Sequence, residues 1–194
     1  ALHPTHISAY SLMYEEDTPL FRMLQKGEIN QIDDETSLAM YTELINRLTA
    51  NGYEHYEISN FAMPGYRSVH NSNYWHDTPY LGFGAAAHSY NKETRSWNIP
   101  DLKKYIESIE SGVLPSESEV IDADTHYNDL ITTALRTREG LNLDDLPQKY
   151  REYALVNARK SISEHLLEAT DSHIRLTREG LFVSDMVMSE LIKA

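Results

Sequence analysis

The first third of the chain alternates between β-type and helical patterns of apolar residues. Thr5–Leu12 is apolar and rich in β-forming residues, which predicts a strand of a covered sheet. Thr36–Ala50 has apolar residues at helical spacing, and Asp33 or Asp34 can cap the start of this predicted helix. Tyr53–Ser59 has the pattern of a second strand. Strand, amphipathic helix and strand in this order predict an α/β domain, although two strands are too few for a complete barrel.

The middle of the chain has little periodicity. Residues 60–100 are rich in glycine, proline, asparagine, serine and aromatic residues, which predicts a long loop that is functional or ordered by a ligand. A short helix is predicted over Asp101–Ser111. The polar, unpatterned residues 115–119 indicate a domain boundary. We therefore expect one domain over residues 1–115 and a second over residues 119–194.

The second expected domain has a mainly helical pattern. Its predicted elements are helices over Asp124–Thr137, Leu143–Tyr150 and Tyr153–Ala169, a strand over His173–Thr177, and a last helix over Leu181–Ile192. Three helices, a strand and a closing helix resemble a winged-helix module. The predicted fold class is therefore α/β with a C-terminal helical, winged-helix-like domain.

Composition and charge restrict the classes of partner. The 194 residues are 41% hydrophobic and 24% charged, which is ordinary for a globular protein. The net charge of −13 opposes nucleic-acid binding, because that affinity comes largely from Lys and Arg that neutralise phosphates. The predicted helix over Tyr153–Ala169, which would be a recognition helix, also carries Glu164 and Glu168. We expect no nucleic-acid partner and a cytoplasmic protein that its charge keeps in solution.

The chain contains no cysteine, and this narrows its chemistry further. Disulfides, thiolate zinc sites and thiolate-held iron–sulfur clusters are excluded within these 194 residues. We see no apolar run as long as a membrane span and no signal peptide. Because the sequence opens without Met, inside a predicted strand, we expect a piece of a longer protein.

The stretch VHNSNYWHD, Val69–Asp77, is the strongest candidate for chemistry. A neutral imidazole is a good axial ligand for haem iron, so His70 is a candidate ligand. Tyr74 and Trp75 could pack against the macrocycle. The alternative is a turn with a Tyr-Trp hydrophobic plug, because His-Asn-Ser-Asn favours turn geometry.

Other stretches give weaker signals. A zinc site of His70, His76 and His88 has no helical two-histidine spacing to support it. LGFGAAAHSY, residues 81–90, places small residues where a backbone approaches a neighbour closely, and a tight turn feeding a helix is the simplest interpretation. Glu15–Asp17 could bind a cation or act as a base, but a charged strand end is the commoner role.

Several stretches together resemble one family. They are HISAYSLMYEEDTPL, YEISNFAMPGYRSVHNSNYW, YLGFGAAAHSY, TALRTREGLNL and HIRLTREGLFVSDMV. In this order, and over nearly the whole chain, they resemble the C-terminal half of the oxygen-independent coproporphyrinogen III oxidase-like radical-SAM proteins. The resemblance implies the last strands and helices of a partial radical-SAM α/β barrel, followed by a C-terminal helical domain.

The resemblance also implies cofactors and site residues. In the family, a CxxxCxxC segment upstream holds a [4Fe–4S] cluster that binds S-adenosylmethionine. The family's HNxxYW motif is associated with haem, which implies His70, Asn71, Tyr74 and Trp75 as haem-binding residues, with His70 on the iron. Alignment with the related oxidase points to Met13 and His88 near S-adenosylmethionine.

The family includes both oxidases and haem chaperones, and HNxxYW favours a chaperone that passes haem to an acceptor such as a respiratory enzyme. A true coproporphyrinogen III oxidase of porphyrin biosynthesis and a non-catalytic docking module are the alternatives, and a homodimer is compatible with each. Without the cluster cysteines we expect no radical chemistry from this chain alone. The sequence departs from the family pattern in one loop, which reads GAAAH where relatives often have GAGAH. The extra methyl group is expected to narrow the space for a close backbone approach.

Overall fold

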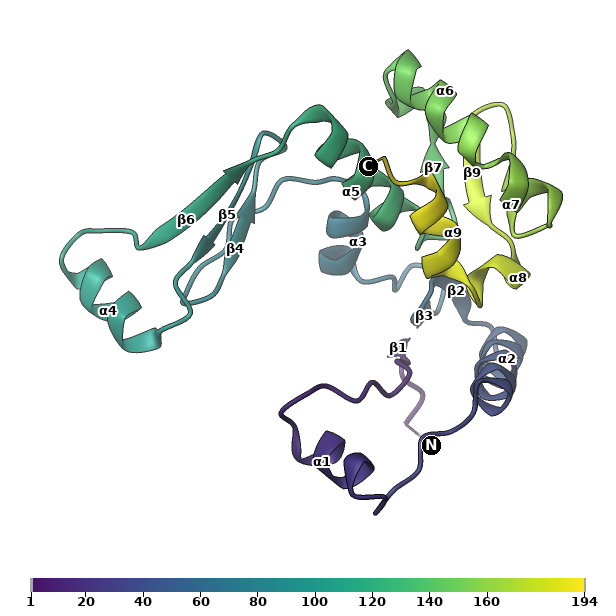
Figure 1. Ribbon diagram of the computed structural model, residues 1–194, viewed down its shortest axis with the longest axis horizontal. Helices are drawn as coiled ribbons and strands as arrows, with labels where there is room; N and C mark the ends of the chain where they lie inside the picture. Colours follow the sequence, from purple (N-terminus) through teal and green to yellow (C-terminus); the bar gives the residue numbers. More distant parts are fainter. Residues whose placement is uncertain (1, 194) are drawn as a thin grey trace. The chain divides into compact units, whose positions relative to one another are not determined.

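The structure is a computed structural model that describes residues 2–193 (Figure 1). The chain divides into two compact units, one up to Ser68 and one from Val69. Over the described residues, no helix combines the length and the apolar character needed to cross a membrane.

The described part of the first unit is a small sheet with two helices. Its elements are β1 (His6–Ser8), α1 (Pro19–Gln25), α2 (Asp34–Ala50), β2 (Glu54–Glu57) and β3 (Asn60–Ala62). The strand order is β1-β3-β2 with both pairs antiparallel, and Phe61 of β3 lies opposite Ile7 on one side and His55 on the other.

Helix α2 confirms the helix predicted over Thr36–Ala50. Asp33 is its N-cap, and the carboxylate accepts a hydrogen bond from the backbone N–H of Thr36 at 2.7 Å. The helix ends at Asn51, and Gly52 follows with a φ of +88°, a conformation that suits glycine.

The predicted first strand was wrong in its length. The segment over Thr5–Leu12 pairs only as β1, and Leu12 is 68% exposed. β3 pairs with both β1 and β2, and it forms a tight hairpin with β2. Tyr41 of α2 holds that hairpin by donating a hydrogen bond to the backbone oxygen of Ile58 at 2.6 Å.

The loop predicted over residues 60–100 was also wrong. Besides β3, this region and the residues after it form α3 (Val69–Trp75), β4 (His88–Tyr90), β5 (Thr94–Asn98), α4 (Leu102–Glu110) and β6 (Ser116–Val120). The three strands form an antiparallel sheet in the order β4-β5-β6. Figure 1 shows them as a long ribbon with α4 at its end. We call β4, β5, β6 and α4 the ribbon.

The rest of the second unit has winged-helix topology. Its elements are α5 (Ala123–Ala134), β7 (Leu141–Asn142), a 3₁₀ turn (Leu143–Asp145), α6 (Gln148–Asn157), α7 (Arg159–Ser163), β8 (Leu167–Ala169), β9 (His173–Leu176), α8 (Arg178–Leu181) and α9 (Ser184–Leu191). The sheet order β7-β9-β8 is antiparallel, and β8 and β9 form the wing. The predicted winged-helix-like character is therefore confirmed.

Two predicted helices in this part had the wrong bounds. Leu143–Tyr150 is a 3₁₀ turn followed by the start of α6, because Pro147 has no N–H to continue a helix across it. Tyr153–Ala169 breaks into α6, α7 and β8, and His165, with a φ of +60°, ends the helical conformation.

One apolar core holds the winged-helix part together. Tyr127 stacks on Tyr150 with ring centroids 4.9 Å apart and donates a hydrogen bond to the backbone oxygen of Leu191 at 2.9 Å. The other fully buried large side chains in this core are Ile131, Leu135, Leu143, Leu167, Ile174, Val187 and Leu191.

The segment expected to separate two domains is not an unpatterned linker. Ser116–Val120 is strand β6, which pairs along its whole length with β5. No sequence pattern indicated this strand because all five of its side chains are exposed, and four of the five are polar. Its pairing with β5 defines it. The compact units divide at Ser68 instead, and a separate domain over residues 119–194 stays a proposal.

Candidate functional site

Helix α3 carries the HNxxYW stretch, so the interpretation of this stretch as a turn was wrong. His70 and Tyr74 are four residues apart and share one helix face. Their ring centroids lie 5.0 Å apart with perpendicular planes. The His70 side chain is exposed and Tyr74 is 41% exposed, so this face is open to a ligand.

Asn71 and Trp75 form the second pair of the motif. They also lie four residues apart, but on the neighbouring face of α3, and both are half-buried. Each of these two residues already has an interaction within the chain. The helix therefore brings His70 together with Tyr74 and presents Asn71 and Trp75 in a different direction.

Three tyrosines extend the His70 face into the ribbon. The Tyr74 and Tyr80 ring centroids are 4.8 Å apart, and those of Tyr80 and Tyr90 are 5.9 Å apart. Tyr80 and Tyr90 also exchange backbone hydrogen bonds of 2.9 Å in each direction, which fixes their register. We call His70, Tyr74, Tyr80 and Tyr90 the aromatic ladder.

Asp77 anchors the end of α3 beside this ladder. Its carboxylate accepts hydrogen bonds from the Tyr90 hydroxyl at 2.5 Å and from Lys92 Nζ at 2.9 Å, and His126 Nε2 lies 3.2 Å away. Burial raises the pKa of Asp77, but these hydrogen bonds outweigh it and hold the pKa below its ordinary value. Burial, and then the Asp77 carboxylate, raise the pKa of Tyr90, so its hydroxyl stays a donor.

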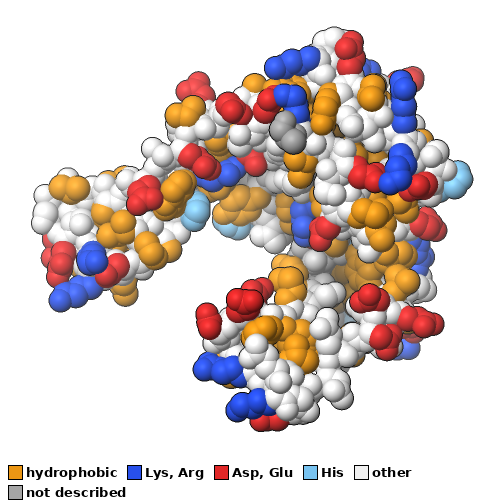
Figure 2. Space-filling model, viewed as in Figure 1, with side chains coloured by type: hydrophobic (Ala, Val, Ile, Leu, Met, Phe, Trp, Pro, Cys, Tyr) orange, Lys and Arg blue, Asp and Glu red, His pale blue; other side chains and the backbone are white. Residues whose placement is uncertain are grey.

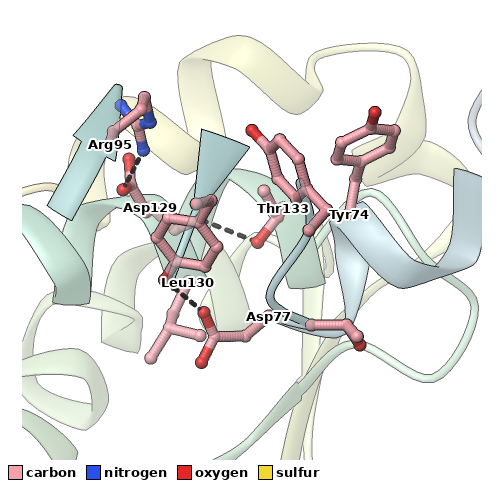
Figure 3. A pocket seen from close by; sticks show the side chains of 9 residues that line it. Tyr74, Asp77, Arg95, Asp129, Leu130 and Thr133 are labelled. Atoms are coloured by element: carbon pink, nitrogen blue, oxygen red, sulfur yellow. Dashed lines mark hydrogen bonds and ion pairs between the residues drawn. The ribbon is translucent and has the colours of Figure 1, made fainter. Parts of the chain in front are cut away.

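A small cavity of about 130 Å³ is lined by ladder tyrosines together with charged residues (Figure 3). Arg95 of β5 crosses it to Asp129 of α5 at 2.5 Å and also pairs with Glu119 of β6 at 3.2 Å. Burial disfavours the guanidinium charge, but the Asp129 and Glu119 carboxylates outweigh this and raise the pKa of Arg95. These ion pairs join the ribbon to α5.

The residues expected near S-adenosylmethionine lie in different compact units. Met13 belongs to the first unit and is 71% exposed. His88 belongs to the second unit, is exposed on β4, and has its ring 6.1 Å from that of Trp97. Their pairing around S-adenosylmethionine stays a prediction. In the described chain, His70, His76 and His88 form no group that could hold a metal ion.

The small residues of LGFGAAAHSY approach the chain itself. A Cβ at Gly82 would lie 2.2 Å from the backbone oxygen of His88, so the close contact is with β4. The turn feeds this strand and not the predicted helix. Ala86 has a φ of +59°, a conformation that glycine adopts at lower cost.

Sequence reasoning missed Tyr80, Asp77, Arg95 and Asp129. Tyr80 is the first residue of the stretch YLGFGAAAHSY, but it joins the aromatic ladder only because a β-bridge pairs it with Tyr90. The Arg95–Asp129 pair joins residues 34 positions apart, and no local sequence pattern predicts such a pair.

Comparisons with known proteins agree with this architecture. Residues 121–183 match the family model of the HemN C-terminal domain. The heme chaperone HemW of Bacillus subtilis is 30% identical over 99% of this chain and 52% of its own length, and HemW of Mycobacterium tuberculosis is 32% identical over 96% and 47%. The structure of the radical-SAM coproporphyrinogen III oxidase HemN of Escherichia coli matches 98% of this chain and 48% of its own, with a TM-score of 0.71 and 18% identity.

These findings define the class of protein. The fold is that of the HemN-type radical-SAM enzymes in their C-terminal part. The chain belongs to the HemN-like radical-SAM family, and it corresponds to the C-terminal half of its members. It spans about half the length of the curated relatives that it matches.

Proposed function

We propose that this chain is the haem-binding part of a haem chaperone, with haem as its cargo and His70 as the axial ligand to iron. The observation that carries the proposal is the exposed His70 imidazole at the end of the aromatic ladder. An imidazole supplies the axial bond, and aromatic side chains pack against the macrocycle. The names of the HemW relatives support the same cargo.

Asn71 and Trp75 have a different part in the proposal. Both are half-buried and already engaged within the chain, so we assign them to holding α3 in place. His70 and Tyr74 then make the direct contacts. This division separates a ligand pair from a support pair within one motif.

The proposal extends to the longer relatives. The iron–sulfur cluster, and S-adenosylmethionine with it, would be bound by residues outside this chain, since a chain without cysteine does not supply thiolate ligands for the cluster. We also propose a cytoplasmic location and transfer of haem to an acceptor protein such as a respiratory enzyme. A homodimer stays a prediction. The acidic composition argues against a nucleic-acid partner.

A haem titration of the His70→Ala variant tests the axial ligand. We expect the affinity for haem to fall at least about tenfold and the Soret band to shift, because the iron–imidazole bond is lost. Added free imidazole should restore the band if the vacant position on iron is the only defect. The matched control is His76→Ala, which removes another exposed histidine just after α3. Unchanged affinity and spectrum in His70→Ala would remove His70 from the ligand role.

A coproporphyrinogen III oxidase is the second candidate, favoured by the structural match to HemN. The two candidates differ in what the chain retains alone. A chaperone part should bind haem without S-adenosylmethionine, whereas an oxidase part should bind the colourless porphyrinogen in preference to haem. Competition between the two tetrapyrroles, measured under anaerobic conditions, separates them.

A further inference from the structure

A larger cavity adjoins the candidate site on the ribbon. It has a volume of about 710 Å³, within the usual range for small-molecule sites. Its walls include Tyr80, Leu81, Phe83, Tyr90, Tyr105 and Leu114. Tyr80 and Tyr90 line both this cavity and the smaller one, so the aromatic ladder extends into the larger cavity. We call this larger cavity the ribbon groove.

The walls of the ribbon groove are largely apolar and open to solvent. Leu81 is 70% exposed, Phe83 84% and Leu114 61%. Figure 2 shows hydrophobic side chains gathered along the ribbon and α4. Contiguous exposed apolar side chains mark a binding surface more often than isolated ones do.

The chemistry of the lining restricts the ligand. None of the described residues that line the ribbon groove is charged. The polar ones are hydroxyls and amides, and Asn98 is already used to fix the loop by donating a hydrogen bond to the backbone oxygen of Gly84 at 2.8 Å. A carboxylate would lack a counter-ion here. A flat apolar ring system suits these walls.

We infer that the ribbon groove receives the apolar edge of a tetrapyrrole whose iron is bound by His70. This inference rests on the proposed function, because only two ring contacts, from His70 to Tyr74 and from Tyr74 to Tyr80, separate the imidazole from the groove. The charged edge of the ligand lies outside the groove, since the groove offers no cation. Affinity therefore has two separable sources, the iron–imidazole bond and apolar burial.

Metal-free protoporphyrin IX separates these sources, because it has no iron for His70 to bind. We measure its affinity and that of haem for the wild-type chain, Phe83→Ser and His70→Ala. Phe83→Ser should weaken the binding of both ligands about tenfold, since burying a phenylalanine contributes about that factor. His70→Ala should weaken haem alone. Because Phe83 is 84% exposed, its loss should leave the fold intact. The control Val156→Ser removes an apolar side chain of α6 that is 53% exposed and does not line the groove.

The outcomes distinguish the two proposals. If Phe83→Ser leaves both affinities unchanged, or if the wild-type chain does not bind protoporphyrin IX, the ribbon groove is not the site, whatever His70→Ala does. If Phe83→Ser and Val156→Ser weaken binding equally, the apolar contact is nonspecific and the inference is also overturned. If Phe83→Ser weakens both ligands and His70→Ala weakens neither, the groove stands and the axial-ligand proposal fails.

Discussion

Among single residues, Asp77 has the most consequential set of contacts near the site. It lies just after α3 and takes hydrogen bonds from Tyr90 and Lys92 of the ribbon, with His126 of α5 beside it. Its φ of +52° is a conformation that aspartate tolerates better than most residues. One carboxylate thus fixes α3, the ribbon and α5 relative to one another, and α3 carries His70.

Asp77→Asn should lower the free energy of unfolding by about 1–3 kcal/mol at neutral pH, because the charged acceptor of partly buried hydrogen bonds is lost. The pKa of Asp77 is lower in the folded state than its ordinary value of 3.8. The carboxylate therefore contributes its full stability above that value and loses it as the pH falls through the lower folded pKa. Urea unfolding at several pH values should show the wild type converging on the variant in acid.

Asp145→Asn is the control for this prediction. Asp145 is an exposed carboxylate in the same unit, and its neutralisation should change stability little at any pH. A difference between wild type and Asp77→Asn that stays constant from neutral to acid pH would contradict the role given to the Asp77 charge.

At the scale of elements, the sequence predicted the capped helices and missed the short pairings. α2, α4 and α5 were predictable because each has an aspartate N-cap, Asp33, Asp101 and Asp122, before an apolar period. The strands of the ribbon have three to five residues and few buried side chains, so their pairing partners define them. Residue types alone do not encode such pairings.

The candidate site follows the same division. His70 and Tyr74 could be named from the sequence because one short motif holds both. Local propensity failed on their conformation, since His-Asn-Ser-Asn favours turns while packing of α3 against α5 stabilises a helix (Figure 1). Tyr80 and Tyr90 entered the site only through long-range pairing.

The turn between α5 and β7 gives a prediction at this scale. Gly140 has a φ of +75°, and an added Cβ would lie 2.3 Å from the backbone oxygen of Ile174 in β9. Gly112 has nearly the same φ, +76°, with nothing within 4 Å of such a Cβ. Gly112→Ala should cost about 1 kcal/mol for the left-handed conformation alone, and Gly140→Ala should cost clearly more.

Chemical denaturation of both variants measures the difference, which isolates the contact between the turn and β9. The predicted order holds if Gly140→Ala shifts the urea midpoint well below that of Gly112→Ala. Equal midpoints would mean that the turn can move away from β9 at little cost, and that β9 does not constrain the conformation of the turn.

At the scale of the whole molecule, burial is distributed unevenly between the two units. The extended apolar core of Tyr127, Ile131, Leu135 and their neighbours lies in the second unit. Over the described residues of the first unit, the buried apolar side chains are Ile45, Tyr56, Phe61 and Ala62. Local stability follows the density of buried apolar contacts, so the two units should open with different free energies.

Hydrogen exchange tests this difference along the native chain. Backbone amides of α5, α9 and β9 should be the most protected, and those of α2 and the β1–β3 sheet should exchange much faster. Helix α4 serves as an internal reference, because it belongs to the second unit but has no buried residue and should also exchange fast. Mass spectrometry of the exchanging peptides resolves these segments. If α2 proved as protected as α5, or α4 as protected as α9, buried apolar contact would not be what sets local stability here, and the whole chain would open as one cooperative unit.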